Sequence, residues 1–263
     1  MLAIDQVYCG DASWMLRDVD TETVDLVVTS PPYDKLRKYL GVGDTWNHDK
    51  FRSIALELYR VLKPGGVVVW VVNDQTENGS ETGTSFRQAL GFLNIGFKLT
   101  DTMIWHKTNP MPQVKQPRYN QVFEYMFVFS KGKPKTFNPL MEPCKCAGQV
   151  YDSTCKNMGG ENGRTHKTFN VNAEKVMGNI WDIAVAQNKT GHPAVFPYEI
   201  PYRHIQSWTN PGDLVLDPFM GSGTTALAAL DLGRHYIGIE MNEEYCKMCR
   251  ERINNAILMF NSK

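Results

Sequence analysis

An apolar run that two consecutive prolines end is the feature that most constrains how this chain can fold. Residues 24–28 (Val-Asp-Leu-Val-Val) have the composition of a buried strand, and residues 29–33 (Thr-Ser-Pro-Pro-Tyr) follow directly. Because proline has a nearly fixed φ angle and no N–H group to donate, the strand must end at Pro31. We therefore expect a rigid corner at the carboxyl end of a strand, which is where open α/β sheets bind ligands.

This corner carries groups that suit an exocyclic amine. The Ser30 hydroxyl and the carbonyls of Ser30 and Pro31 can accept N–H bonds, and the Tyr33 ring can stack on a heterocycle. For this stretch alone, a strand followed by a proline-rich turn without function is an equally good interpretation. Another pattern in the chain must decide between the two.

A glycine-rich turn far along the chain supplies that second pattern. Residues 217–225 (Asp-Pro-Phe-Met-Gly-Ser-Gly-Thr-Thr) lie between an apolar run, 214–216, and the helix-forming residues 226–230, so we predict a strand, a turn and a helix. Glycines allow close approach of a ligand, and the helix N-terminus offers unpaired N–H groups. The turn has neither the phosphate-loop pattern nor the GxGxxG spacing. Residues 236–240 predict a further strand ending in Glu240, a carboxylate that suits a ribose diol. The sequence therefore favours an adenosine-bearing cofactor that needs no pyrophosphate site.

These motifs together resemble a known family. TSPPY at 29–33, HPAVFPYEIP at 192–201 and DPFMGSGTT at 217–225 are similar to motifs of amino-directed DNA methyltransferases that use S-adenosyl-L-methionine. Their order, SPPY before DPFxGSGT, resembles the circularly permuted beta class. The resemblance covers nearly the whole chain except about 136–178. It implies an α/β, Rossmann-like methyltransferase fold in one catalytic domain, 1–263, with a mostly parallel sheet and helices on both faces.

The resemblance also implies a set of site residues. The catalytic residues would be those of the corner, Ser30, Pro31, Pro32 and Tyr33. They would bind the amine of a base that is flipped out of the duplex. Asp11 follows a short predicted strand, and we expect either a helix N-cap or a contact to the cofactor's adenine, which are compatible roles. The predicted cofactor-binding residues are Asp11, Phe196, Pro197, Glu199, Asp217, Phe219, Gly221, Ser222, Gly223, Thr224 and Glu240.

The acceptor amine is predicted from one position. Cytosine-N4 members of the resembling family usually have Ser where this chain has Ser30, whereas adenine-N6 members more often have Asp or Asn. We therefore predict transfer to the N4 amine of cytosine, with the N6 amine of adenine as the alternative. Two more distant alternatives are a DNA-binding module without catalysis and a methyltransferase acting on RNA. Methylation of a small molecule is a further alternative.

Basic residues concentrate in the middle of a chain whose formal net charge is zero. Between 107 and 175 there are 11 Lys/Arg and five Asp/Glu, and such a surface suits DNA phosphates. The polar segment at about 136–178 is the predicted DNA-recognition insert. Its Cys144, Cys146, Cys155 and His166 lack the usual zinc spacing, so we expect no metal. The predicted DNA-binding residues are Lys35, Arg37, Lys38, Lys107, Lys131, Lys133 and Lys135.

The remaining chain indicates an intracellular enzyme. There is no apolar run long enough to span a membrane and no leader pattern, and the six cysteines suit reduced thiols, so we expect a cytoplasmic protein. Double-stranded DNA is the expected partner, and a homodimer and a partner restriction endonuclease stay open.

The remaining sequence predicts further helices and strands. The 63–66 segment should end a helix, 67–72 should be a central parallel strand, and the C-terminal helix should only pack. The remaining predicted helices are 51–62, 84–97, 200–208 and 242–260, and the remaining strands are 99–106 and 123–130.

Overall fold

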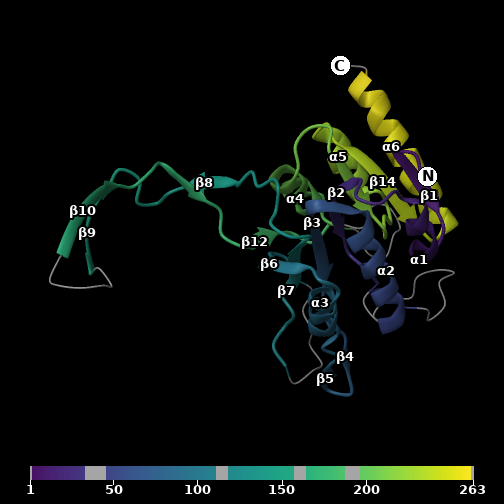
Figure 1. Ribbon diagram of the computed structural model, residues 1–263, viewed down its shortest axis with the longest axis horizontal. Coiled ribbons are helices and arrows are strands. Elements are labelled where there is room, and N and C mark those ends of the chain that lie inside the picture. The colour runs from purple at the N-terminus through teal and green to yellow at the C-terminus, as the bar shows by residue number, and fades with distance from the viewer. Residues whose placement is uncertain (1, 33–45, 111–117, 157–163, 187–195, 262–263) are drawn as a thin grey trace. The chain divides into compact units, whose positions relative to one another are not determined.

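A large mixed sheet forms the centre of the fold. The computed structural model describes residues 2–32, 46–110, 118–156, 164–186 and 196–261. Eight strands lie in the order β1-β14-β13-β2-β3-β7-β6-β12 (Figure 1). Neighbouring strands are parallel except at β7, which runs antiparallel to β3 and β6, so the predicted mostly parallel sheet is confirmed. The strands are β1 (Gln6–Cys9), β2 (Val24–Thr29), β3 (Leu62–Val72), β6 (Lys98–Lys107), β7 (Phe123–Ser130), β12 (Ile180–Ile183), β13 (Leu214–Asp217) and β14 (His235–Glu240).

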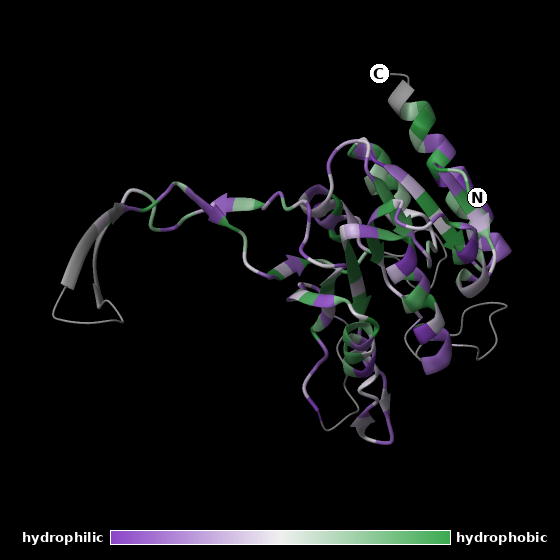
Figure 2. Cartoon of the chain, in the orientation of Figure 1, coloured by the Kyte–Doolittle hydropathy of each residue, from purple (hydrophilic) through white to green (hydrophobic). Residues whose placement is uncertain are grey.

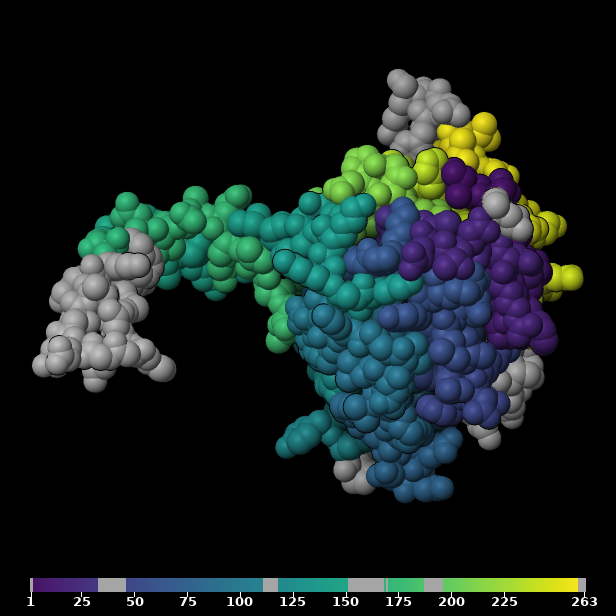
Figure 3. Space-filling model, in the orientation of Figure 1, coloured from purple at the N-terminus to yellow at the C-terminus, as the bar shows by residue number. Residues whose placement is uncertain are grey.

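Helices cover both faces of this sheet. The helices of a first group contact one another in chain order and lie on one face of the sheet. In the space-filling view, α2 (His48–Val61) lies beside α3 (Thr84–Ile95) (Figure 3). Leu214 and Leu216 belong to the apolar core under this group. Val215, between them, is also buried but does not belong to that core, because successive side chains of a strand point to opposite faces of the sheet. The first group is α1 (Ala12–Met15), a 3₁₀ turn, η1 (Leu16–Asp18), α2 (His48–Val61) and α3 (Thr84–Ile95), and the second is α4 (Glu199–Trp208), α5 (Thr224–Asp231) and α6 (Glu243–Asn261).

Aromatic side chains fill the core between the sheet and the first helix group. Phe51, Trp70, Phe92 and Phe129 are almost completely buried, and their rings contact one another edge to face or stacked. The one polar atom of the Trp70 ring donates to Gln88 Oε1 at 2.8 Å, so its burial leaves no unpaired donor there. Apolar residues concentrate on the central strands (Figure 2).

The structure corrects two expectations about β3. The helix α2 ends at Val61, just before 63–66, as predicted, but residues 63–66 are part of the strand, because Gly65 N donates to Lys131 O and Lys131 N to Gly66 O. The strand is also parallel to β2 only, since its other neighbour, β7, is antiparallel. The other predicted helices and strands are confirmed, with ends that differ by no more than three residues.

Residues Pro139–Gly178 form a second compact unit. It holds two small antiparallel pairs, one of β8 (Met141–Pro143) with β11 (Glu174–Val176), the other of β9 (Val150–Lys156) with β10 (Arg164–Asn170). Met141, Val150 and Val176 are about half exposed, so β8 and β11 bury little apolar surface. Among the described residues, no helix is long and apolar enough to cross a bilayer.

Candidate active site

The two sequence patterns meet in the middle of the sheet. β2 and β13 are adjacent and parallel, with Val27 opposite Leu216, so their carboxyl ends lie at the same edge. The chain continues from β13 toward β14 on one side and from β2 toward β3 on the other. This arrangement is a topological switch point, the place where open α/β sheets bind ligands. It brings Ser30, Pro31 and Pro32 beside the Asp217 turn, while Tyr33 lies outside the described residues.

Asp217 organises the glycine turn from within. Its side chain is buried, and Oδ1 accepts from Thr29 Oγ1 at 2.6 Å and from Phe219 N at 3.0 Å. Oδ2 accepts from Thr225 Oγ1 at 2.6 Å. Burial raises the pKa of Asp217 to about 6, against the lowering effect of these donors. Asp217 is buried and both of its oxygens accept hydrogen bonds from the chain itself, so it shapes the turn. Its contact with a cofactor stays a prediction.

Helix α6 contributes to the same turn. Gly223 has φ +85°, and a Cβ placed there would lie 2.6 Å from Cys249 Sγ. Arg252 Nη1 donates to the Ser222 carbonyl from the same helix. The expectation that the C-terminal helix only packs is therefore wrong, because α6 also donates a hydrogen bond to the backbone of the turn. The turn continues into α5, which begins at Thr224.

Glu240 binds the turn from the neighbouring strand. At the end of β14, its carboxylate accepts from Gly221 N at 2.8 Å and from Asn242 N at 2.9 Å. Burial raises the pKa of Glu240, and the backbone donors oppose that rise. The Glu240 carbonyl accepts from Gly10 N at 2.9 Å, which brings the start of α1 to the same edge. A carboxylate oxygen can accept a further hydrogen bond, so this geometry is compatible with a diol ligand.

Asp11 caps α1, as one of its two predicted roles requires. Its carboxylate accepts from Ser13 N at 2.9 Å and from Lys50 Nζ at 2.7 Å. Burial raises the pKa of Asp11, but the bonds from Lys50 and Ser13 outweigh burial, and the pKa lies below its ordinary value. The side chain is therefore an ionised acceptor between α1 and α2, near the Glu240 carbonyl.

Phe219, a predicted cofactor-binding residue, contacts two tryptophans that the sequence motifs did not indicate. Its ring meets Trp46 edge to face at 5.4 Å and Trp70 at 6.1 Å. Trp46 was missed because it stands between polar residues and belongs to no motif, and its place before the α2 start was the only available signal. Trp46 also borders a small cavity, which is lined by Trp46, Asn47, His48, Phe51, Thr84, Arg87 and Gln88.

The predicted residues before α4 show no contact with the glycine turn among their described hydrogen bonds and ion pairs. Pro197 is buried and Phe196 is half-buried. Glu199 opens the helix, and its carboxylate lies 3.5 Å from Arg203 one turn along. Their assignment to the cofactor stays a prediction.

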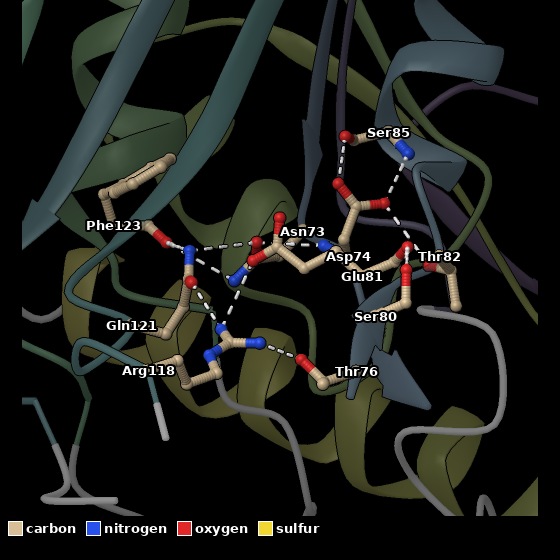
Figure 4. Close-up of polar contacts among 10 residues, drawn as sticks. All are labelled: Asn73, Asp74, Thr76, Ser80, Glu81, Thr82, Ser85, Arg118, Gln121 and Phe123. Atoms are coloured by element: carbon tan, nitrogen blue, oxygen red, sulfur yellow. Dashed lines mark hydrogen bonds and ion pairs between the residues drawn. The ribbon is translucent and has the colours of Figure 1, made fainter. Parts of the chain in front are cut away.

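A polar network lies where β3 ends, one strand from the corner (Figure 4). Asn73 Nδ2 and Gln121 Nε2 both donate to the Phe123 carbonyl at 3.3 Å. Arg118 donates to Gln121 Oε1 at 2.8 Å and to Thr76 Oγ1. The network therefore ties the end of β3 and the start of β7 to a small hairpin of β4 (Thr76–Glu77) and β5 (Ser80–Glu81).

The same network fixes the start of α3. Asp74 Oδ1 accepts from Ser85 N at 2.9 Å, and Oδ2 accepts from Ser85 Oγ, so a buried carboxylate caps the helix. Thr82 N donates to the Gln75 carbonyl at 2.8 Å and closes the hairpin. This edge of the sheet is therefore held by several mutually bonded segments beside Ser30.

The predicted DNA-binding lysines do not form one free surface. Lys107 pairs with the buried Glu124 at 2.8 Å, and Lys131 pairs with Glu22 at 2.9 Å and donates to the Leu62 carbonyl. Lys131 therefore lies at the amino end of β3, the opposite edge from Ser30. Lys133 and Lys135 are exposed at that same amino end, because Lys135 N donates to Gly65 O.

Three of these lysines lie at the edge opposite Ser30 and Lys107 is paired with Glu124, so the observed positions do not favour phosphate contact, which stays a prediction. Lys35, Arg37 and Lys38 lie outside the described residues. The second unit contributes little to the basic excess, since residues 139–178 contain five Lys/Arg and four Asp/Glu. Within the described ranges, no group of three His, Cys, Asp or Glu could hold a metal ion.

The comparisons with known proteins agree on one family. A family model described as DNA methylase, N6_N4_Mtase, matches residues 24–251. The orphan methyltransferase M.BamHII of Bacillus amyloliquefaciens is 47% identical over 258 residues, which are 93% of this chain and 94% of that protein. DNA adenine methyltransferase YhdJ of Escherichia coli (strain K12) is 31% identical over 260 residues, 94% of this chain and 82% of that protein.

A solved structure repeats the fold over the same length. The M1.HpyAVI–SAM complex superposes with a TM-score of 0.61 at 26% sequence identity, and the match covers 94% of this chain and 98% of that chain. The residues that the family model matches, 24–251, include both the β2 corner and the β13 turn.

Proposed function

This chain belongs to the N6/N4 DNA methylase family, and from that membership we propose that it transfers a methyl group to the N4 amine of cytosine in duplex DNA. The observation that carries the proposal is the adjacency of β2 and β13, which gives the acceptor corner and the glycine turn one common edge. An amine held at Ser30 would then lie next to whatever the turn holds. The family supports the reaction, and the strand order supports the place that we propose for it.

S-adenosyl-L-methionine is the methyl donor, as the family membership and a solved relative in complex with it show. When bound, it supplies a methyl group on a sulfonium centre. The residues fit such a molecule, because the glycine turn leads into the N-terminus of α5 and the Glu240 carboxylate suits a ribose. The Phe219 ring and the Asp11 carboxylate would receive the adenine, by stacking and by accepting its amine protons. Phe196, Pro197 and Glu199 stay proposed contacts to the methionine end.

The corner would orient the acceptor amine. The lone pair of an exocyclic amine is delocalised into the ring, which makes the amine a poor nucleophile. Ser30 Oγ and a carbonyl of Ser30 or Pro31 would accept both N–H bonds and keep the lone pair directed at the methyl group. The base must leave the duplex to reach this buried edge, and Tyr33 would stack on it. Pro31 and Pro32 hold the carbonyls in place through their fixed φ angles.

The choice of cytosine over adenine rests on Ser30 alone. The amines of both bases present two N–H donors, so the corner itself accepts either. A relative at 31% identity is named an adenine methyltransferase, which keeps N6 transfer as the second candidate. Nucleoside analysis of DNA methylated by the protein decides between them. We expect N4-methyldeoxycytidine, and N6-methyldeoxyadenosine in its place would overturn the acceptor while leaving the corner's role intact.

Recognition of the DNA sequence is proposed to lie in the second unit, Pro139–Gly178. Met141, Val150 and Val176 of this unit are about half exposed, and Lys145 is exposed, which supports a role in contacting a partner. Phosphate contacts would come from Lys35, Arg37 and Lys38 in the segment after the corner. A homodimer and a partner restriction endonuclease stay predictions.

The substrate class is tested with methyl-labelled cofactor. Duplex DNA, RNA and a small-metabolite extract are offered to the protein in parallel, at equal cofactor concentration. We expect label in duplex DNA. Label that enters RNA or metabolites and not DNA would overturn the proposal in favour of one of the alternatives.

A further inference from the structure

A buried hydrogen bond directly joins the two halves of the site. Thr29 is the last residue of β2 and is fully buried, and its hydroxyl donates to Asp217 Oδ1 at 2.6 Å. The donor and the acceptor are 188 positions apart in the chain and lie on neighbouring strands. Thr29 immediately precedes Ser30, so the bond connects the acceptor corner to the acid that shapes the glycine turn.

The bond also reaches the backbone of the turn through one carboxylate oxygen. Asp217 Oδ1 accepts from Thr29 Oγ1 and from Phe219 N together, while Oδ2 accepts from Thr225 Oγ1. Phe219 N and Thr225 Oγ1 still hold the carboxylate when the Thr29 hydroxyl is removed, so the turn keeps its own support and only the link to β2 is lost. Because Thr29 and Asp217 are both buried, water cannot easily replace a lost partner.

We infer that Thr29 is a positioning residue that sets the acceptor corner relative to the methyl-donor turn. The inference rests on the proposed methyl transfer and goes beyond it by naming the link between its two subsites. Displacement at the acceptor needs reacting atoms aligned at close contact, and a misplacement of about 1 Å can cost about 100-fold in rate. A short hydrogen bond to a carboxylate is the kind of contact that holds such alignment.

The choice of side chain supports this role over simple packing. Valine has the shape of threonine and suits a buried strand end without needing a partner. Threonine here requires an acceptor, and the structure supplies the acid of the turn. Thr225 is a matched reference, because it donates to the same carboxylate at the same 2.6 Å but belongs to α5 and not to the acceptor strand.

The test compares Thr29→Val, Thr29→Ser and Thr225→Val with the wild-type protein. Thermal unfolding reports folding, calorimetry reports cofactor affinity, and a single-turnover assay at saturating cofactor reports methyl transfer to DNA. We expect Thr29→Val to bind cofactor nearly as wild type does and to lose about 10- to 100-fold in transfer rate. Thr29→Ser keeps the hydroxyl and should keep the rate. Thr225→Val should chiefly weaken cofactor binding.

Several results would overturn the inference. A folded Thr29→Val protein with the wild-type rate would do so, as would equal effects of Thr29→Val and Thr225→Val on affinity and rate. If Thr29→Val does not fold, Thr29→Ala replaces it under the same criterion, and failure of both to fold would assign Thr29 to folding alone. A wild-type protein that transfers no methyl group to DNA would instead overturn the proposed function, and the inference with it.

Discussion

Gly223 shows how a single position can decide whether the turn exists. Its φ is +85°, and the Cys249 sulfur lies 2.6 Å from the point that a Cβ would occupy, so both the backbone and the space exclude a side chain. Gly233 is a matched control, with φ +70° and nothing within 4 Å of a Cβ.

We predict that Gly223→Ala loses cofactor binding, whereas Gly233→Ala keeps it and costs only about 1–2 kcal/mol of stability from the positive φ. Adding Cys249→Ala to Gly223→Ala should recover part of the binding, because the clash is removed. Calorimetric titration with S-adenosyl-L-methionine measures both effects. Equal cofactor affinity in the Gly223→Ala and Gly233→Ala proteins would mean that the turn does not hold the cofactor.

His204 is a buried group without a hydrogen-bond partner among the described residues. Its ring is fully buried against Trp181, and both nitrogens are unpaired. Burial, with a smaller effect of the Arg203 charge, lowers the pKa of His204 to about 3. The unfolded chain therefore binds one more proton than the folded chain between about pH 3 and 6.5, so stability falls as the pH falls through this window.

We predict that His204→Leu raises the free energy of unfolding by about 1–3 kcal/mol at pH 7, because two unpaired polar atoms are removed. The gain should grow at pH 5. His235→Leu is the control, since that side chain is half exposed and bonded to Asp5, and it should give no gain. Denaturant unfolding at both pH values checks this, and a less stable His204→Leu protein would show that the imidazole has a partner in solution.

At the scale of elements, the sequence predicted more of the fold than of the site. Periodicity and proline or glycine stops predicted the strands and helices of the sheet, because these signals are local. The Thr29–Asp217 bond and the Trp46–Phe219 contact were not predictable, since each depends on which strands or loops become neighbours. Likewise, the lysines at 131, 133 and 135 do not indicate in the sequence at which edge of the sheet they will lie.

The lysines after β7 provide a test of that edge. Lys133 and Lys135 lie at the amino end of β3, away from Ser30, so Lys133→Glu with Lys135→Glu should leave DNA methylation and its salt dependence unchanged. Lys145→Glu in the second unit is the comparison, because we propose that this unit meets DNA. Methylation rates over a range of salt concentrations are the measurement. A lower rate with a flatter salt dependence in the double variant would show that these lysines contact DNA.

At the scale of the whole molecule, the second unit is joined to the core by two anchored ends. Asn138 N donates to the Ser207 carbonyl at 2.7 Å, and the Asn179 carbonyl accepts from Ile104 N at 2.8 Å. These contacts belong to the core and do not involve residues 139–178. The core should therefore keep its structure when the unit is replaced.

We predict that a flexible Gly-Ser linker in place of 139–178 preserves cofactor affinity and abolishes the preference for one DNA sequence. Calorimetry and sequencing of the methylated positions measure the two properties. Sequence preference that survives the replacement would place the reader elsewhere in the chain. Loss of cofactor binding would show that the unit supports the core.

The central claim is that Ser30 and the glycine turn form one methyl-transfer site across β2 and β13. The most direct measurement is methyl transfer from labelled S-adenosyl-L-methionine to DNA by Ser30→Ala, at cofactor concentrations that calorimetry shows to be saturating. We predict cofactor affinity equal to wild type and a transfer rate lower by about 100-fold or more, because the amine loses an oriented acceptor. Transfer at the wild-type rate by this variant would contradict the account.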